Sequence, residues 1–342
     1  MRTATIHHTS IIRAASIPLA AFALAFTTAC GGDTERTAPP AETPPITPVV
    51  SAGESSGTAT GPVRVDYSNV SYEVAESTYT QRRFGESTAM FEAYVQRKPE
   101  NPWGHYMLGL SAWKAGDLDR ARLALERSHD LDPTHVKSLL NLGRVLLDLD
   151  RAGEAKERIE AALALDSTSG EVHRMLGRVQ SALGSHEAAI EAYRVALTFD
   201  PTEAWAMNNL ALIYIQQERY EEALGPLARA VQLRPGAPVF QNNLGIVLER
   251  TGHIGAAREA FVAAIAADSS YVKAQVSLKR VEGREDDPAV IPVELSVLAD
   301  AFEREVQRWR EERMAAVTPE TGVTVRPESL ATIPDSLPLP PR

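Results

Sequence analysis

Residues 170–203 read GEVHRMLGRVQSALGSHEAAIEAYRVALTFDPTE, and residues 204–237 read AWAMNNLALIYIQQERYEEALGPLARAVQLRPGA. The two segments align without a gap, because Leu176-Gly177 of the first lies 34 residues before Leu210-Ala211 of the second. Each segment has room for a helix, a turn, a second helix and a second turn. A fixed period of this length predicts a repeat architecture, in which stacked units bury a shared core.

The same register extends in both directions along the chain. Blocks of 34 residues without insertions or deletions begin at Ser68, Pro102, Val136, Gly170, Ala204 and Pro238. Position eight of every block is Gly or Ala, and position twenty is Ala or, in the first block, Ser. Position twenty-four is always large and apolar. We therefore expect two helices to approach closely at the small residues, with the large side chain filling the space beside them.

Small residues at positions eight and twenty, a large one at twenty-four and proline at thirty-two in four blocks resemble the tetratricopeptide repeat. The resemblance covers residues 68–271. It implies an all-α fold, a superhelical solenoid of six helix-turn-helix repeats. Residues 272–283 begin a seventh block, and we expect them to form a helix that caps the last apolar face.

The N-terminal residues have the layout of a secretory signal peptide, with Arg2 and Arg13, an apolar run and no acidic residue before Cys30. The sequence TTACG at 27–31 resembles the lipobox of bacterial lipoproteins, in which the cysteine is acylated and becomes the new N-terminus. We expect a signal peptide over 1–29 and lipid on Cys30, the single cysteine; cleavage near Ala29 without lipidation is the alternative. Residues 30–67 are rich in Pro, Thr, Gly and Ser and are predicted to form a linker.

The resemblance implies that positions two, five, six, nine, twelve and thirteen of each first helix line a concave groove, where such domains bind extended peptides or partner helices. Asparagine recurs at positions five and six: Asn141, Asn208, Asn209, Asn242 and Asn243. Asparagine is a poor residue for a helix interior, so its recurrence needs a reason. A primary amide can pair with the backbone of a ligand, and the pattern resembles the asparagine ladder of O-linked N-acetylglucosamine transferase repeats. The alternative is that these amides join stacked repeats.

Cations and tryptophans share the same arc of the first helices. They are Lys137, Arg144, Arg174, Arg178, Trp103, Trp113 and Trp205. In a chain with 35 Lys+Arg and 45 Asp+Glu, this cluster favours an acceptor site for carboxylates, although exposed cations on a helix are also common. The net charge of −10 excludes broad attraction to nucleic acid, so no nucleic-acid partner is expected.

An amphipathic helix is predicted over residues 293–316. Its apolar residues Leu295, Leu298, Phe302, Val306 and Trp309 follow at spacings of 3, 4, 4 and 3. Three roles are open: packing on the last repeats, occupation of the groove in cis, and self-association. The proline-rich residues 317–342 are expected to be disordered.

Nucleotide, metalloprotease and serine-hydrolase signatures are absent from the sequence, and too few residues lie outside the repeats for a catalytic domain. We therefore predict a non-enzymatic chain without cofactor or metal. The leading hypothesis is a lipid-anchored adaptor or scaffold that binds protein partners in the bacterial cell envelope. It is similar in plan to pilotins of type IV pilus secretins, outer-membrane assembly lipoproteins and scaffolds for peptidoglycan hydrolases. The alternative, favoured by the aromatic and cationic residues, is a binding module for cell-wall peptides or glycans.

The predicted location follows from the lipobox. A lipidated Cys30 implies a membrane anchor with the repeats facing the periplasm. Gly31, rather than Asp, follows the cysteine, which in enteric lipoproteins permits transport to the outer membrane. We therefore expect the outer membrane.

Overall fold

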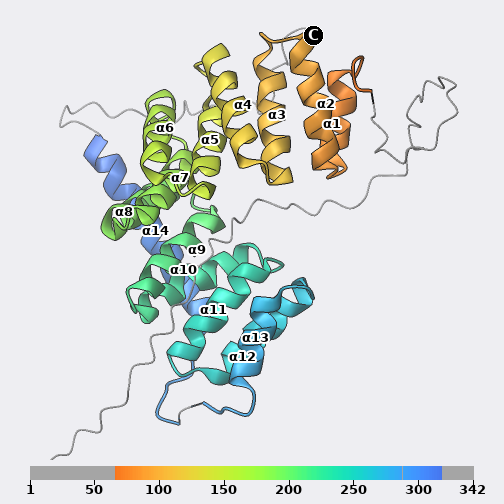
Figure 1. Cartoon of the computed structure of the whole chain (residues 1–342). Coiled ribbons are helices and arrows are strands. Elements are labelled where there is room, and N and C mark those ends of the chain that lie inside the picture. Colours follow the sequence, from red (N-terminus) through yellow and green to blue (C-terminus); the bar gives the residue numbers. More distant parts are fainter. Residues whose placement is uncertain (1–65, 287, 318–342) are drawn as a thin grey trace, which may run out of the picture. The chain divides into compact units, whose positions relative to one another are not determined.

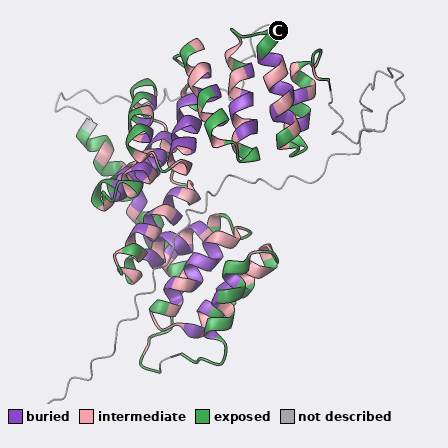
Figure 2. Ribbon diagram, in the orientation of Figure 1, coloured by how far each residue is buried: buried purple, intermediate pink, exposed green. Residues whose placement is uncertain are grey.

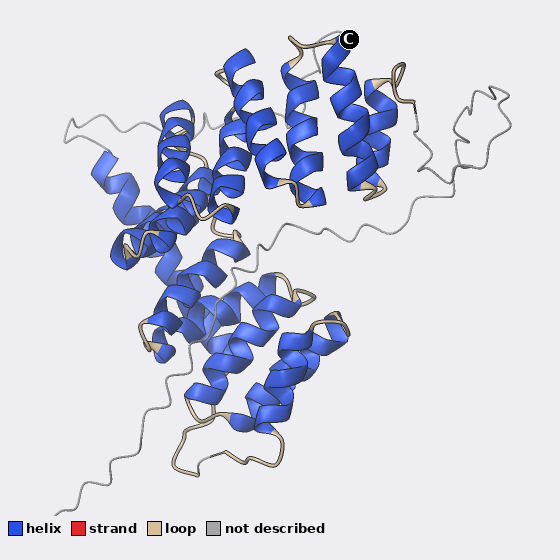
Figure 3. Ribbon diagram, in the orientation of Figure 1, coloured by secondary structure: helices blue, strands red, loops and turns tan. Residues whose placement is uncertain are grey.

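A computed structural model describes residues 66–286 and 288–317, and the regular structure in these ranges is entirely helical (Figures 1 and 3). Helices follow one another in antiparallel pairs joined by short turns, which confirms the predicted all-α tetratricopeptide solenoid. The predicted signal peptide, Cys30, most of the linker and the proline-rich tail lie outside the described residues.

We call the first helix of each pair an A helix and the second a B helix. The A helices are α1 (Tyr72–Thr80), α3 (Pro102–Ala115), α5 (Val136–Asp148), α7 (Gly170–Ala182), α9 (Ala204–Gln216) and α11 (Pro238–Arg250). The B helices are α2 (Phe84–Arg97), α4 (Leu118–Leu131), α6 (Ala152–Leu165), α8 (His186–Phe199), α10 (Tyr220–Leu233) and α12 (Ile254–Ala267). A seventh A helix, α13 (Val272–Val281), follows α12, and α14 (Leu295–Val317) comes last.

Side chains and prolines at the helix starts explain several of these boundaries. The Asn101 side chain accepts a hydrogen bond from the Gly104 N–H, and Pro102 occupies the first turn of α3. The first block begins at Ser68, but α1 begins only at Tyr72, because Ser71 is its N-cap and accepts from the Val74 N–H.

Each of the six paired A helices is followed by a residue with left-handed backbone geometry at position fifteen. In three repeats the residue is glycine, with φ between 73° and 87°: Gly116, Gly184 and Gly252. In the other three, φ lies between 57° and 62°: Arg82, Asp150 and Glu218. The turn is therefore the same in every repeat, although this geometry is strained for a residue with a Cβ atom.

The large side chain at position twenty-four fills the space beside the small residue at position eight. A methyl group on Gly109 or Gly143 would lie 2.6 Å from Leu125 Cγ or Ile159 Cδ1 respectively. The same contact would be 2.5 Å for Gly245 against Phe261 Cε1. These distances are too short for real carbon contacts, so the predicted close approach of the two helices is confirmed. Figure 2 shows the buried residues along the facing sides of the paired helices.

The amphipathic helix α14 packs on the B helices α8 and α10 (Figure 1). Phe302, Val306 and Trp309 are buried there in one cluster with residues of α8 and α9. Gly225 of α10 lies at this contact, where a methyl group on it would meet Phe302 Cβ at an ordinary van der Waals distance of 3.4 Å. Around this contact, Arg229 Nη2 of α10 donates to Glu303 Oε1 at 2.6 Å.

This packing decides between the three roles open for the helix. Its apolar stripe is covered by α8 and α10, which belong to the fourth and fifth repeats rather than to the last. The stripe is therefore neither laid along the A helices nor available to a second copy. The prediction of self-association through 293–316 is not supported, because Phe302, Val306 and Trp309 have already lost their contact with water.

Candidate functional site

The A-helix face is the set of side chains at positions two, five, six, nine, twelve and thirteen of the repeats. Consecutive A helices contact one another all the way from α1 to α13. Side chains at these positions therefore form one continuous surface of the solenoid. It contains every ligand-binding residue predicted from the sequence.

The asparagines on the A-helix face make hydrogen bonds within the chain. Asn141 Nδ2 donates to the Tyr106 hydroxyl at 3.0 Å and so joins α5 to α3. Asn243 Nδ2 donates to Asn208 Oδ1 at 2.8 Å and joins α11 to α9, while Asn208 Nδ2 donates to Asn209 Oδ1 at 3.3 Å. These bonds support the alternative in which the amides stack the repeats.

The burial of the asparagines points the same way. Asn141, Asn208 and Asn243 are buried, and Asn209 is the partly exposed member of the set. Asn242 is only 3% exposed, and its Oδ1 accepts no hydrogen bond within the described residues. Contact of these amides with a ligand backbone stays a prediction, and Asn209 has the best access for it.

Two of the four predicted cations are neutralised by carboxylates of the same chain. Arg144 donates to Asn141 Oδ1 at 2.8 Å and to Glu171 Oε1 at 2.5 Å. Arg174 is buried, and its Nε lies 3.2 Å from Glu203 Oε2. The chain itself thus supplies acids for two of the four cations, and an acceptor site for a partner's carboxylate stays a prediction.

Glu171 and Glu203 are functional neighbours that sequence reasoning missed. Glu171 follows Arg144 by 27 residues, which is the offset from position nine of one repeat to position two of the next. Glu203 stands immediately before α9 and also accepts the Trp205 N–H at 3.1 Å, so it caps that helix. A comparison of side chains 27 residues apart, at positions nine and two of adjacent repeats, would have identified Glu171 as a partner of Arg144.

The other two predicted cations are not held in this way. Arg178 Nη1 lies 3.6 Å from Met175 Sδ, and no ion pair of this side chain is present within the described residues. Lys137 is exposed at the start of α5. On the A-helix face, Arg178 is consequently a partly exposed guanidinium that can meet an external carboxylate.

Aromatic side chains gather on the second repeat. Trp103, 38% exposed, lies against His135 with ring centroids 4.6 Å apart, and Tyr106 meets the same imidazole at 4.9 Å. Burial raises the pKa of Tyr106 to about 12, although the nearby Arg144 guanidinium acts to lower it. The phenol is therefore neutral at physiological pH and accepts the Asn141 bond as a hydroxyl.

The remaining two tryptophans of the prediction are partly buried. Trp113 Nε1 donates to Asp148 Oδ2 at 2.7 Å, and Lys114 Nζ lies 4.4 Å from the centroid of the Trp113 ring. Trp205 packs edge-on against Phe240 at 4.8 Å, and its Nε1 has no hydrogen-bond partner within the described residues. Much of this aromatic surface stabilises the stacking of neighbouring repeats.

Apolar side chains complete the A-helix face at positions nine and twelve. They are half-buried residues that the sequence analysis did not single out: Leu110, Leu147, Leu212, Ile215 and Ile246. Their recurrence at two positions was the available signal. Half-buried aliphatic side chains in a row on a rigid support can bind apolar side chains of an extended segment or a helix.

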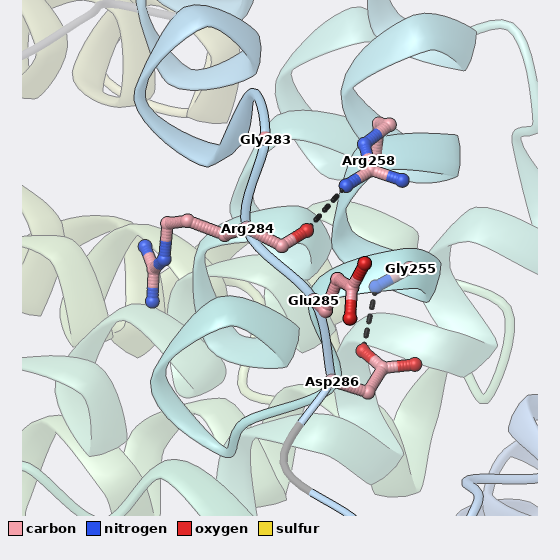
Figure 4. A pocket seen from close by; sticks show the side chains of 6 residues that line it. All are labelled: Gly255, Arg258, Gly283, Arg284, Glu285 and Asp286. Carbon is pink, nitrogen blue, oxygen red and sulfur yellow. Dashed lines mark hydrogen bonds between the residues drawn. The ribbon is translucent and has the colours of Figure 1, made fainter.

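A pocket of about 360 Å³ lies elsewhere, where the loop after α13 folds against the start of α12 (Figure 4). Asp286 Oδ1 accepts the Gly255 N–H at 2.7 Å, and Arg258 donates to the Arg284 carbonyl at 2.7 Å. The N-terminus of α12 is thereby occupied by a carboxylate of the chain itself. We assign this pocket a structural role in holding the loop.

Within 66–286 and 288–317, no cluster of three or more His, Cys, Asp or Glu side chains could hold a metal ion. None of the helices in the same ranges has the length and hydropathy that crossing a bilayer requires.

Comparison with protein families gives three matches, each to a family described as tetratricopeptide repeat. They cover residues 72–136, 112–179 and 165–236. The matched segments therefore run from the first predicted repeat into the fifth. Their overlap agrees with the A and B helices of the structure.

Similar proteins include human tetratricopeptide repeat protein 7B, 30% identical over 157 residues, or 45% of this chain and 19% of that protein. The type IV pilus assembly protein PilF of Pseudomonas aeruginosa is 34% identical over 110 residues, or 32% of this chain and 44% of PilF. The matches thus span less than half the length of these relatives.

The crystal structure of the APC/C heterotetramer Cut9–Hcn1 superimposes with a TM-score of 0.54. It is 19% identical, and the match covers 61% of this chain and 42% of that chain. At this identity, the likeness concerns the fold alone.

Proposed function

Because the chain is a tetratricopeptide-repeat protein, we propose that it is a non-enzymatic adaptor that binds a protein partner along its A-helix face. The observation that carries this proposal is the row of half-buried aliphatic side chains at positions nine and twelve, among them Leu147 and Leu212. Asn141, Arg144 and Asn243 on this face each bond to a neighbouring A helix, which fixes the surface before a partner binds.

Site-specific crosslinking tests the location of the binding surface. A photoreactive amino acid at Leu147 or Leu212 should crosslink one and the same partner in native membranes. The matched controls are Leu123 and Leu165, which are apolar, exposed and located on B helices. Crosslinking of a partner from the control positions alone would place binding outside the A-helix face. The identified partner, once purified, should bind less tightly to the variants Leu147→Ser and Leu212→Ser.

We further propose that Cys30 carries lipid and anchors the adaptor in the bacterial envelope, facing the periplasm and in the outer membrane. The lipobox-like sequence supports the anchor, and the similarity to the type IV pilus assembly protein PilF supports an envelope role. Metabolic labelling with a fatty-acid analogue should mark the wild-type chain and not Cys30→Ser. An unlabelled wild-type chain that fractionates with soluble periplasmic proteins would rule the anchor out.

A module for cell-wall peptides or glycans is the second candidate, supported by the exposed face of Trp103. Sugar recognition also needs hydrogen-bonding groups beside the rings. The Tyr106 hydroxyl and the Trp113 indole N–H are already bonded within the chain. Muropeptides that co-purify with the wild type and are lost from Trp103→Ala would favour this candidate over a protein partner.

A further inference from the structure

Charge changes along the A-helix face from the first repeat to the sixth. Position nine shows the change in the residue order Glu76, Leu110, Arg144, Arg178, Leu212 and Ile246. Arg144 is paired with Glu171. The other two charged residues at position nine, Glu76 and Arg178, have no ion pair in the described part of the chain. Position nine is therefore acidic in the first repeat, cationic in the third and fourth, and apolar in the fifth and sixth.

The acidic end is surrounded by tyrosines. Tyr72 and Tyr79 lie on α1 with Glu76, and Tyr106 lies on the neighbouring α3. Glu76 follows Tyr72 by four residues on α1, so the two side chains are neighbours on one face of the helix. Burial and then the charge of Glu76 raise the pKa of Tyr72 to about 12. An exposed carboxylate beside aromatic rings is the environment that Arg and Lys side chains prefer.

Several cations of the chain near this end have other contacts. Arg97 and Lys98 lie over the Tyr94 ring, 5.8 and 5.6 Å from its centroid. Arg83 pairs with Glu86, and Lys114 lies over Trp113 in the second repeat. The Glu76 carboxylate is exposed in the first repeat and has no ion pair within residues 66–286 and 288–317, so a cation from outside can reach it.

We propose that the partner segment carries an Arg or Lys that binds at Glu76 and an Asp or Glu that binds at Arg178. This inference rests on the proposed function, because it names the chemistry of the partner on the same face. Three helix spacings separate α1 from α7, about 24–30 Å at the usual interaxial distance of 8–10 Å. An extended segment covers that distance with about seven to nine residues.

The test is a selection of random 16-residue peptides, displayed on phage, against the full chain. Selected peptides should carry a basic and an acidic residue about seven to nine residues apart, in one order and not in both. Selection on Glu76→Arg should lose the basic residue and keep the acidic one. Selection on Arg178→Glu should lose the acidic residue and keep the basic one. Peptides selected on the wild-type chain should bind each of the two variants about tenfold more weakly.

Matched controls separate these effects from a general change of charge. Glu157→Arg on α6 and Arg304→Glu on α14 alter exposed residues outside the A-helix face and should leave the selected pattern unchanged. Peptides that bind the A-helix face without this charge pattern would overturn the inference while leaving the proposed function intact. The absence of any peptide competing for the A-helix face would count against both.

Discussion

The ring of Tyr193 occupies the space that a side chain on Gly177 would need. A methyl group added to Gly177 would lie 2.5 Å from Tyr193 Cε1 and 2.6 Å from its Cδ1. Tyr193 is fully buried between α7 and α8 and cannot move aside without disturbing the repeat. We therefore expect Gly177→Ala to lower the free energy of unfolding by about 1–3 kcal/mol, measured by urea denaturation.

Gly153→Ala is the matched control for this substitution. Gly153 lies inside α6, and a methyl group on it would meet no atom within 4 Å. Alanine has the higher helix propensity, so this variant should gain about 0.5–1 kcal/mol. Equal effects of the two substitutions would contradict the assigned contact between positions eight and twenty-four.

Glycine should stabilise the fifth repeat at its left-handed turn. Glu218 has φ 59° two residues after the end of α9, at the position where three other repeats have glycine. This geometry costs an L-residue about 1–2 kcal/mol of folding free energy. Glycine avoids that cost but loses more backbone entropy on folding, so it recovers only part of this free energy. Glu218→Gly should therefore raise the melting temperature, while Glu218→Ala should not. A lower melting temperature for the glycine variant would refute the turn geometry.

Glu249 links α11 to the end of α13 and should make stability depend on pH. Its side chain is 9% exposed and accepts hydrogen bonds from Arg280 and Arg284. Burial opposes ionisation, but these bonds outweigh it and hold the pKa of Glu249 below its ordinary 4.5. The folded state thus binds its proton less readily than the unfolded state, so the contribution is present above pH 4.5 and is lost as pH falls through the folded pKa.

The variant Glu249→Gln measures this contribution. At pH 7 it should be less stable than the wild type by about 1–2 kcal/mol, and the difference should shrink by pH 3. Glu259→Gln on α12 is an exposed control that should change little at either pH. A difference that stays constant from pH 7 to pH 3 would show that the ion pairs are not responsible.

Removal of the Trp309 side chain should weaken the fourth and fifth repeats. Trp309 is buried against α8, where the Arg194 guanidinium lies 4.5 Å from its ring centroid. Trp309→Ala should cost about 3–5 kcal/mol through lost burial and a cavity. Hydrogen exchange should accelerate in α8 and α10 more than in α3 and α4. Val297→Ala, at an exposed position of α14, is the control and should leave exchange unchanged.

Sequence reasoning located the repeats because their pattern is local. A period of 34 residues with glycine at position eight and a large residue at position twenty-four requires one particular pairing of neighbouring helices, as Gly177 and Tyr193 show. The same local logic predicted the amphipathic helix that forms α14. The left-handed turns at Arg82, Asp150 and Glu218 have no such local signal, because none of these residues is glycine.

By itself, the sequence determined the repeat, its register, the all-α solenoid and the face on which Asn141, Arg144 and Arg178 lie. Only the tertiary structure decided which of these side chains remain open. Arg144 meets Glu171 across two A helices, Asn141 meets Tyr106, and α14 finds its place on α8 and α10 more than 60 residues away in sequence. Such contacts depend on how helices stack in three dimensions, and an amide, a cation or an apolar stripe is compatible with several partners until that stacking selects one.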